Sequence, residues 1–354
     1  MPFLCFLVPL LYSGLFMWPE GTPKLAVLGL MVPILVSKFR GPPEGLLFLL
    51  WTLLASIWST SVYDWIGEIA WLLILAGTFC IEADPRRCLT AFSAGMALNF
   101  PVVIAQKFHW LELITTTNWP PGLFVNSNYL AASSCLALVA MICLRNWWLA
   151  VPILGNIALS GSKGAMVSLS TAAGLWLWKR NRAATVVLAL AVAAGMGLYA
   201  MNAPWRIFGP RMEIYETVIS HLRFFGWGTG SFWSAYPMIA NPDTSSVAVF
   251  GFQMRPQNAH SDFLTILFQY GVPGALLALL FVARIATVRI YNRTDHACRY
   301  VFAAFLGFGF FDFPLFIYAT GFVAAFCAGH LYRLGSDVRS QYRVVRLPLC
   351  RSES

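Results

Sequence analysis

The chain has 354 residues, of which 58% are hydrophobic and 11% are charged, and its mean hydropathy is +0.68. Soluble domains carry about 25% charged residues, so this composition excludes a soluble globular protein and predicts an all-α, polytopic membrane protein. The net charge is +9, but basic clusters follow alternate hydrophobic segments, which is the pattern that orients membrane helices. The charge therefore indicates topology, and nucleic acid is not an expected partner.

Continuous apolar runs predict about twelve transmembrane helices. Their expected ranges are 2–18, 23–38, 43–60, 62–82, 87–107, 123–144, 146–161, 164–178, 183–202, 262–288, 297–312 and 315–333. With the basic clusters in the cytoplasm, both termini are cytoplasmic and the longest polar stretch is periplasmic. The chain then divides into helices one to nine (1–202), a periplasmic loop with active-site residues (203–261), helices ten to twelve (262–334) and a cytoplasmic tail (335–354).

The predicted loop contains four arginines, at positions 206, 211, 223 and 255. Apolar residues recur at helical spacing from 211 to 225, which predicts an amphipathic helix that lies in the membrane interface and roofs the bundle. Pro210 suits the first turn of that helix, so Arg211 is expected at its start. The predicted topology also brings Lys163 and the polar tips 58–68 and 110–128 to the loop side.

The end of the loop carries a specific pattern, in which His260 and Ser261 are followed by Gly271 and Gly274. It resembles the signature of the O-antigen ligase and polymerase superfamily, bacterial membrane enzymes that transfer glycans from a polyprenyl-diphosphate carrier. SGSKGAM (160–166) is similar to the Ser-Arg-Gly segment of that family, although Lys163 replaces the usual arginine. GPRMEIY and FFGWGTGSF resemble its Arg-x-x-x-aromatic and Gly-x-Gly loop, and GLFVNSNYLA (122–131) resembles its Asn-x-Asn helix start.

A carrier diphosphate needs cationic partners at the membrane surface. Arg211 matches the loop arginine of the family, and a guanidinium donates two parallel hydrogen bonds to phosphate oxygens. Lys163 can hold phosphate as a point charge. The alternative is that Arg211 contacts solvent or lipid headgroups and that Lys163 extends its ammonium to the interface.

His260 is the predicted catalytic residue, because histidine is suited to accept a proton from a sugar hydroxyl near neutral pH. The alternative is a structural histidine at a helix end. Neighbours at i+1 and i+2 point to other faces of a helix, so Asp262 is not an obvious partner for it. Possible supporting residues are Asn126, Asn128, Gly228, Ser261, Asp64, Glu68 and Asp312.

Carboxylates on the loop side are scattered, without the Asp-x-Asp pair that holds a divalent ion and a nucleotide diphosphate. The eight cysteines form no CxxC pair. We therefore expect neither a metal site nor a cofactor.

The resemblance implies an inverting, metal-independent glycosyltransferase of the bacterial inner membrane, with its active face in the periplasm. It would move a glycan from undecaprenyl diphosphate to an acceptor hydroxyl, in the manner of an O-antigen ligase that uses lipid A core. An O-antigen or exopolysaccharide polymerase and a protein O-oligosaccharyltransferase share the same motifs and stay open as alternatives. A lipid or polysaccharide transporter is the alternative from another class, and it predicts charges in mid-helix and a repeat between halves.

Overall fold

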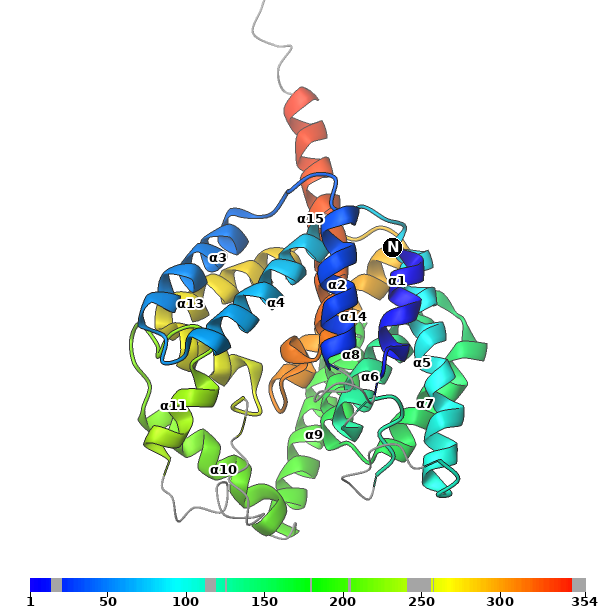
Figure 1. Cartoon of the computed structure of the whole chain (residues 1–354). Coiled ribbons are helices and arrows are strands. Elements are labelled where there is room, and N and C mark those ends of the chain that lie inside the picture. The colour runs from blue at the N-terminus through cyan, green and yellow to red at the C-terminus, as the bar shows by residue number, and fades with distance from the viewer. Residues whose placement is uncertain are drawn as a thin grey trace, which may run out of the picture.

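The computed structural model describes residues 1–13, 21–111, 119–124, 126–178, 180–202, 205–240, 256 and 258–345, and only the backbone at 196–202, 205–210 and 337–345. The described part of the chain is helical and has no strand, which confirms the all-α fold class (Figure 1). In chain order the elements are α1 (Pro2–Leu7), η1 (Val8–Leu10), α2 (Gly21–Leu35), α3 (Pro43–Ala55), η2 (Ser56–Trp58), α4 (Val62–Cys80), α5 (Pro85–Lys107), α6 (Ser127–Leu144), α7 (Trp147–Ser160), α8 (Lys163–Trp178), α9 (Arg182–Asn202), α10 (Trp205–Ser220), α11 (Phe232–Ile239), α13 (Asp262–Ala286), α14 (Arg293–Gly309), η3 (Pro314–Phe316) and α15 (Tyr318–Val345).

Short polar side chains set the starts of several helices. Ser61 caps α4 by accepting the backbone N–H of Asp64, and Asp84 caps α5 by accepting that of Arg86. Asn126, Ser261 and Asn292 cap α6, α13 and α14 in the same way. Such caps satisfy N–H groups that have no partner within the helix. They explain why helices begin where short polar residues interrupt the apolar runs.

Each of the twelve predicted ranges overlaps a helix of the structure. By length and composition, α4, α5, α6 and α13 could each cross a membrane, whereas α2, α3 with η2, α7 and residues 182–195 of α9 are apolar but shorter. The helical character is therefore confirmed, and the number of spans stays a prediction.

Helix α6 lies at the centre of the bundle, where it packs against α7, α14 and α8. It is rich in small residues, including a run from Ala131 to Ser134 that is entirely buried. Small side chains allow helix backbones to approach closely, which is how helices pack in lipid. This close packing fixes the start of α6 relative to the end of α14, where the candidate site lies.

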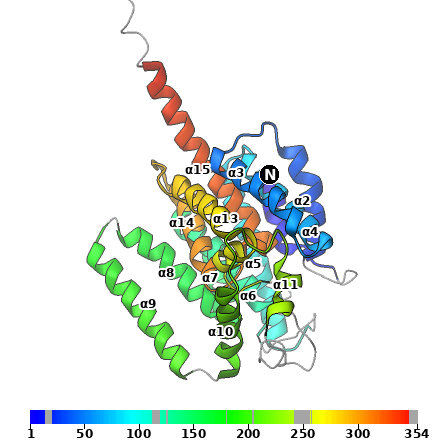
Figure 2. The ribbon, with the colours of Figure 1, turned by 90° about the vertical axis from the view of Figure 1, so that its left-hand side faces the viewer.

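The bundle has two distinct ends (Figures 1 and 2). The N-terminus, the 36–42 and 81–84 connections and the last turns of α15 lie at one end, which we call the tail end. Helices α10 and α11 lie at the opposite end, the loop end, together with the first turn of α13.

Candidate active site

His260 lies just before α13 in a backbone conformation that is uncommon for a residue with a side chain, with φ at 50°. Two contacts hold this turn. The Tyr215 hydroxyl of α10 donates to the His260 carbonyl at 2.9 Å, and the Ser261 hydroxyl donates to the Gly309 carbonyl of α14 at 3.3 Å. Ser261 also caps α13 by accepting the Leu264 N–H. The imidazole is therefore placed by three helices while 30% of its side chain stays exposed.

The connection from α14 to α15 supplies a carboxylate to this histidine. Asp262 fixes the connection, because its N–H donates to the Asp312 carbonyl at 3.1 Å and its Oδ2 accepts the Leu315 N–H at 3.0 Å. As a result Asp312 Oδ1 lies 3.5 Å from His260 Nδ1, with only 4% of the Asp312 side chain exposed. The two groups attract when the imidazole is protonated, although the geometry forms no hydrogen bond. The Phe313 ring packs edge-on against the imidazole at a centroid distance of 5.3 Å.

Arg211 reaches the same connection from α10. One terminal nitrogen of its guanidinium donates to the Phe311 carbonyl at 3.1 Å. Tyr215 follows one turn later on the same helix face, because residues at i and i+4 are neighbours. Burial raises the pKa of the Tyr215 phenol, and the nearby Asp312 carboxylate adds to this while Arg211 opposes it. The phenol therefore stays protonated at neutral pH and remains a donor.

The predicted start of this amphipathic helix is wrong. Helix α10 begins at Trp205, so Pro210 lies inside the helix and Arg211 is not at its N-terminus. The free N–H groups of a helix start therefore do not add anion affinity at Arg211. The Phe311 carbonyl, which lies one residue before Asp312, positions the guanidinium instead.

Lys163 is the first residue of α8, one position before the predicted start of that helix, and follows a turn in which Gly161 is left-handed with φ of 64°. A Cβ added at Gly164 would lie 3.0 Å from the Phe308 ring, so the first turn of α8 packs directly on the end of α14. Phe308 precedes Asp312 by one helical turn. The turn that carries Lys163 therefore adjoins the helix end that leads to Asp312.

The predicted Asn-x-Asn segment forms the start of α6. Asn126 Oδ1 accepts the Asn128 N–H at 2.8 Å and thereby caps the helix. Tyr129 packs edge-on against Phe313 at 5.6 Å between ring centroids. Through that ring the start of α6 contacts the residue beside Asp312, so α6, α8, α10, α13 and α14 meet at one place.

Residues 148–279 match the family model described as O-antigen ligase. Over this range, which is less than half of the chain, the sequence is similar to the O-antigen ligase family. The matched range runs from α7 into α13, and it includes Lys163, Arg211 and His260. The search of curated proteins found no match.

Five predicted residues lie outside the matched range, namely Asp64, Glu68, Asn126, Asn128 and Asp312. Asp312 completes the group around His260, as its 3.5 Å contact shows. Asp64 and Glu68 lie elsewhere, on α4, where Glu68 accepts a hydrogen bond from the Tyr270 hydroxyl. Tyr270 is eight residues beyond Asp262, about 12 Å along α13. The candidate supporting residues therefore form two groups and not one.

The predicted Gly-x-Gly loop packs against the protein itself. Gly226, Gly228 and Gly230 all have positive φ, and a Cβ at Gly228 would lie 2.7 Å from the backbone of Ser59. The Gly228 N–H donates to the Gln269 carbonyl at 2.9 Å. This backbone approach accounts for the glycines, and contact between the loop and a ligand stays a prediction.

No group of three or more His, Cys, Asp or Glu residues that could hold a metal ion occurs in the described ranges.

The other three arginines of the predicted loop do not join this site in the described structure. Arg206 lies where only the backbone is described, and Arg255 lies outside the described residues. Arg223 stacks over the Trp227 ring at 3.4 Å to its centroid, well along the loop from His260.

Tyr215 is the site residue that was not among the predicted ones. It is the aromatic residue of the Arg-x-x-x-aromatic pattern, four positions after Arg211. That spacing could have placed both side chains on one helix face. Its contact with the His260 carbonyl joins residues 45 positions apart, which local spacing does not reveal.

Proposed function

We propose that this membrane protein of the O-antigen ligase and polymerase family is a glycosyltransferase of the inner membrane, with its active site at the loop end and facing the periplasm. It moves a glycan from undecaprenyl diphosphate to an acceptor hydroxyl, as an O-antigen ligase acting on lipid A core. The observation that carries this proposal is the convergence of His260, Asp312, Arg211 and Tyr215, contributed by the turn before α13, by the α14 to α15 connection and by α10.

The donor diphosphate binds beside the guanidinium of Arg211 and the ammonium of Lys163. A guanidinium has five N–H donors. The hydrogen bond from one terminal nitrogen to the Phe311 carbonyl fixes the orientation of the group, and other N–H donors can then bind phosphate oxygens. These cations balance the charge that builds on the diphosphate as it leaves, which is the largest electrostatic demand of the reaction.

His260 accepts the proton of the acceptor hydroxyl. The hydroxyl oxygen bonds to the anomeric carbon while the bond from that carbon to the diphosphate oxygen breaks, and the diphosphate takes the bonding electron pair. Attack from the face opposite the leaving group inverts the anomeric configuration. The imidazolium formed lies 3.5 Å from the Asp312 carboxylate, which offsets its positive charge in a poorly solvated place. No resident metal or cofactor enters this scheme.

The test is transfer by the purified protein in nanodiscs supplied with carrier-linked glycan. Three acceptors are compared, namely lipid A core, a second carrier-linked glycan and a pilin-like protein. Product on lipid A core supports the ligase assignment, whereas product on the second or third acceptor identifies a polymerase or a protein transferase. Movement of intact carrier-linked glycan across the bilayer without any transfer would contradict the enzyme and favour a transporter.

A further inference from the structure

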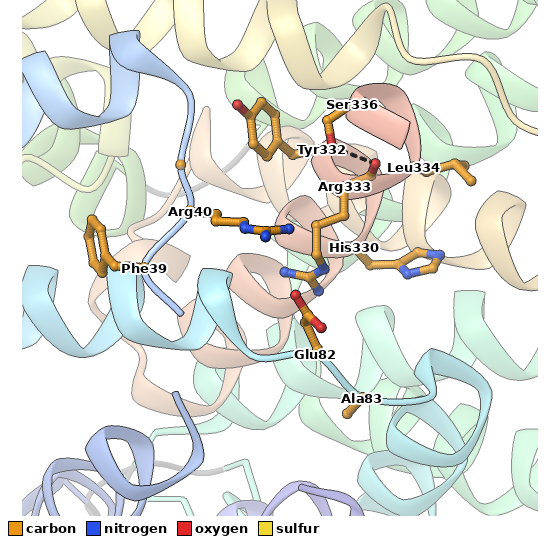
Figure 3. Close-up of a pocket in the computed structure, with 10 residues that line it drawn as sticks. Phe39, Arg40, Glu82, Ala83, His330, Tyr332, Arg333, Leu334 and Ser336 are labelled. Atoms are coloured by element: carbon orange, nitrogen blue, oxygen red, sulfur yellow. Dashed lines mark hydrogen bonds between the residues drawn. The ribbon is translucent and has the colours of Figure 1, made fainter. Parts of the chain in front are cut away.

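A cavity of about 830 Å³ opens at the tail end of the bundle, opposite the candidate active site (Figure 3). The connections after α2 and α4 line it, together with residues 330–336 in the middle of α15. The polar side chains facing it are Arg40, Glu82, His330, Tyr332, Arg333 and Ser336.

Two guanidinium groups make the cavity positively charged. Figure 3 shows Arg40 and Arg333 reaching into the same space, with the Glu82 carboxylate beside Arg333. Arg333 is held in place because its two terminal nitrogens donate to the Phe79 and Ile81 carbonyls at 2.7 and 2.8 Å.

The histidine of the cavity is already engaged. His330 Nε2 lies 2.9 Å from Asp295 Oδ1, which directs that imidazole to a carboxylate. Two arginines against one glutamate leave an excess of positive charge at the mouth. A phosphate group is the chemistry that complements such a pair of guanidinium groups.

An apolar groove of about 440 Å³ continues from this cavity, and both are lined by Phe39 and Gly41. The groove runs between α3, α4, α13 and α15, past residues such as Leu75, Phe79 and Ala278. Its far end reaches Asp262, at the loop end. A charged mouth that opens into a long apolar groove has the shape and the polarity of a phospholipid site.

We propose that the cavity and groove bind a membrane phospholipid, with its phosphate between Arg40 and Arg333 and an acyl chain along the groove toward Asp262. Under the predicted topology this lipid belongs to the cytoplasmic leaflet, where anionic lipids attract basic residues. Its phosphate lies at the end opposite His260, so the proposal does not depend on the proposed function.

The experiment measures lipids that stay bound when the full-length protein is transferred from nanodiscs of phosphatidylglycerol and diacylglycerol into mild detergent and examined by native mass spectrometry. Wild type should retain phosphatidylglycerol in preference to diacylglycerol, which has no phosphate. Arg40→Glu should lower that retention by at least about tenfold, because one charge-assisted contact is lost. Arg333 is not used because it also holds the end of α4.

A matched control is Arg87→Glu. Arg87 lies at the same end of the bundle with 80% of its side chain exposed, and it pairs with Asp84. Equal loss of lipid from both variants would reduce the effect to general surface charge and overturn the proposal.

The groove is tested separately with Ala278→Trp, which fills it, against Leu280→Trp, which lies on an exposed part of the same helix. Retention should fall about tenfold in the first variant only. Unchanged retention in Ala278→Trp would remove the acyl chain from the groove. Displacement of the lipid by inorganic phosphate alone would identify a site for free anions. Loss of the lipid in Arg211→Ala would place the lipid in the donor site. Either result would overturn the proposal.

Discussion

The His260 imidazole faces the Asp312 carboxylate with Nδ1, and this bears on which nitrogen would accept a proton in the proposed reaction. A proton on Nδ1 is favoured by Asp312 Oδ1 at 3.5 Å, and in neutral imidazole the other nitrogen is then the acceptor. Nε2 is therefore the atom expected to take the proton of an acceptor hydroxyl. The carboxylate that does this comes from 52 positions later in the chain and not from Asp262, which instead holds the connection carrying Asp312.

His260→Ala should cut turnover by at least about 100-fold, with folded protein and binding of carrier lipid unchanged. Turnover is measured as transfer per folded molecule. His221→Ala is the control, since His221 is an exposed histidine just after α10 whose Nδ1 lies 2.9 Å from the Thr217 carbonyl of that helix. Near wild-type turnover in His260→Ala would leave His260 a structural residue only.

Arg211→Ala should abolish transfer, and Arg211→Lys should impair it severely, because lysine keeps the charge but loses the planar fork. Arg211 also bonds the Phe311 carbonyl, so the melting temperature is measured beside the activity. Arg223→Ala is the control, since that guanidinium stacks on Trp227. Stable Arg211→Ala protein with full activity would exclude Arg211 from the site.

Lys163→Arg should keep or raise activity, because arginine is the usual residue of the resembled family and can donate two parallel hydrogen bonds to a diphosphate. Lys163→Ala should lower the affinity for carrier-linked donor. The readout is the donor concentration that gives half-maximal transfer. An equal loss from both substitutions would indicate a pocket shaped for lysine.

At the level of elements, α13 is two helical pieces joined at Gly271. Its φ of 65° and ψ of −165° belong to a region that only glycine occupies readily. A Cβ there would lie 2.1 Å from the Phe224 carbonyl oxygen, and the Val272 N–H donates to that same oxygen at 2.8 Å. The break in α13 is thus built jointly with the loop that follows α10.

Gly271→Ala should reduce the yield of folded protein and lower the melting temperature, since backbone strain of about 1–3 kcal/mol adds to a direct steric overlap. Gly67→Ala in α4 is the matched control, because nothing lies within 4 Å of a Cβ at that position. Alanine there should be neutral or slightly stabilising. Thermal unfolding in detergent measures both variants, and equal stability would mean that the backbone at Gly271 relaxes freely.

The sequence allowed the helices to be predicted because apolar runs and capping residues are local signals. Helix α6 begins at the predicted Asn-x-Asn segment, and α8 begins at Lys163. The start of α10 was not predictable in this way, because Pro210 is tolerated inside the helix. The contacts of Asp312 and Tyr215 with His260 required the packing of α14 and α10 onto α13, which no local pattern encodes.

On the scale of the whole molecule, the predicted site residues and the polar tail-end cavity lie at opposite ends of one bundle. Basic residues such as Arg40 and Arg333 lie at the tail end, as the orientation rule for membrane helices expects if this end is cytoplasmic. The two ends should therefore face different compartments.

Cysteines at exposed positions of each end test this orientation. Met238→Cys in α11 should react with an impermeant thiol reagent added from the periplasmic side, and Tyr291→Cys between α13 and α14 should not. Both side chains are well exposed, at 71% and 62%. The described native cysteines are buried or half-buried, and Cys350, which lies outside the described residues, is replaced by serine in the background protein. The reverse labelling pattern would overturn the orientation and the location of the active face.

The break at Gly271 has a mechanical consequence. Residues 262–270 are tied to α10 and to the α14–α15 connection, whereas residues 272–286 pack along α3 within the apolar part of the bundle. A rigid rod would transmit any tilt imposed by a thicker or thinner bilayer directly to His260, since helices tilt to match hydrocarbon thickness. The break at Gly271 lets residues 272–286 tilt while residues 262–270 keep their position. We therefore expect transfer to depend little on the acyl-chain length of the surrounding lipid.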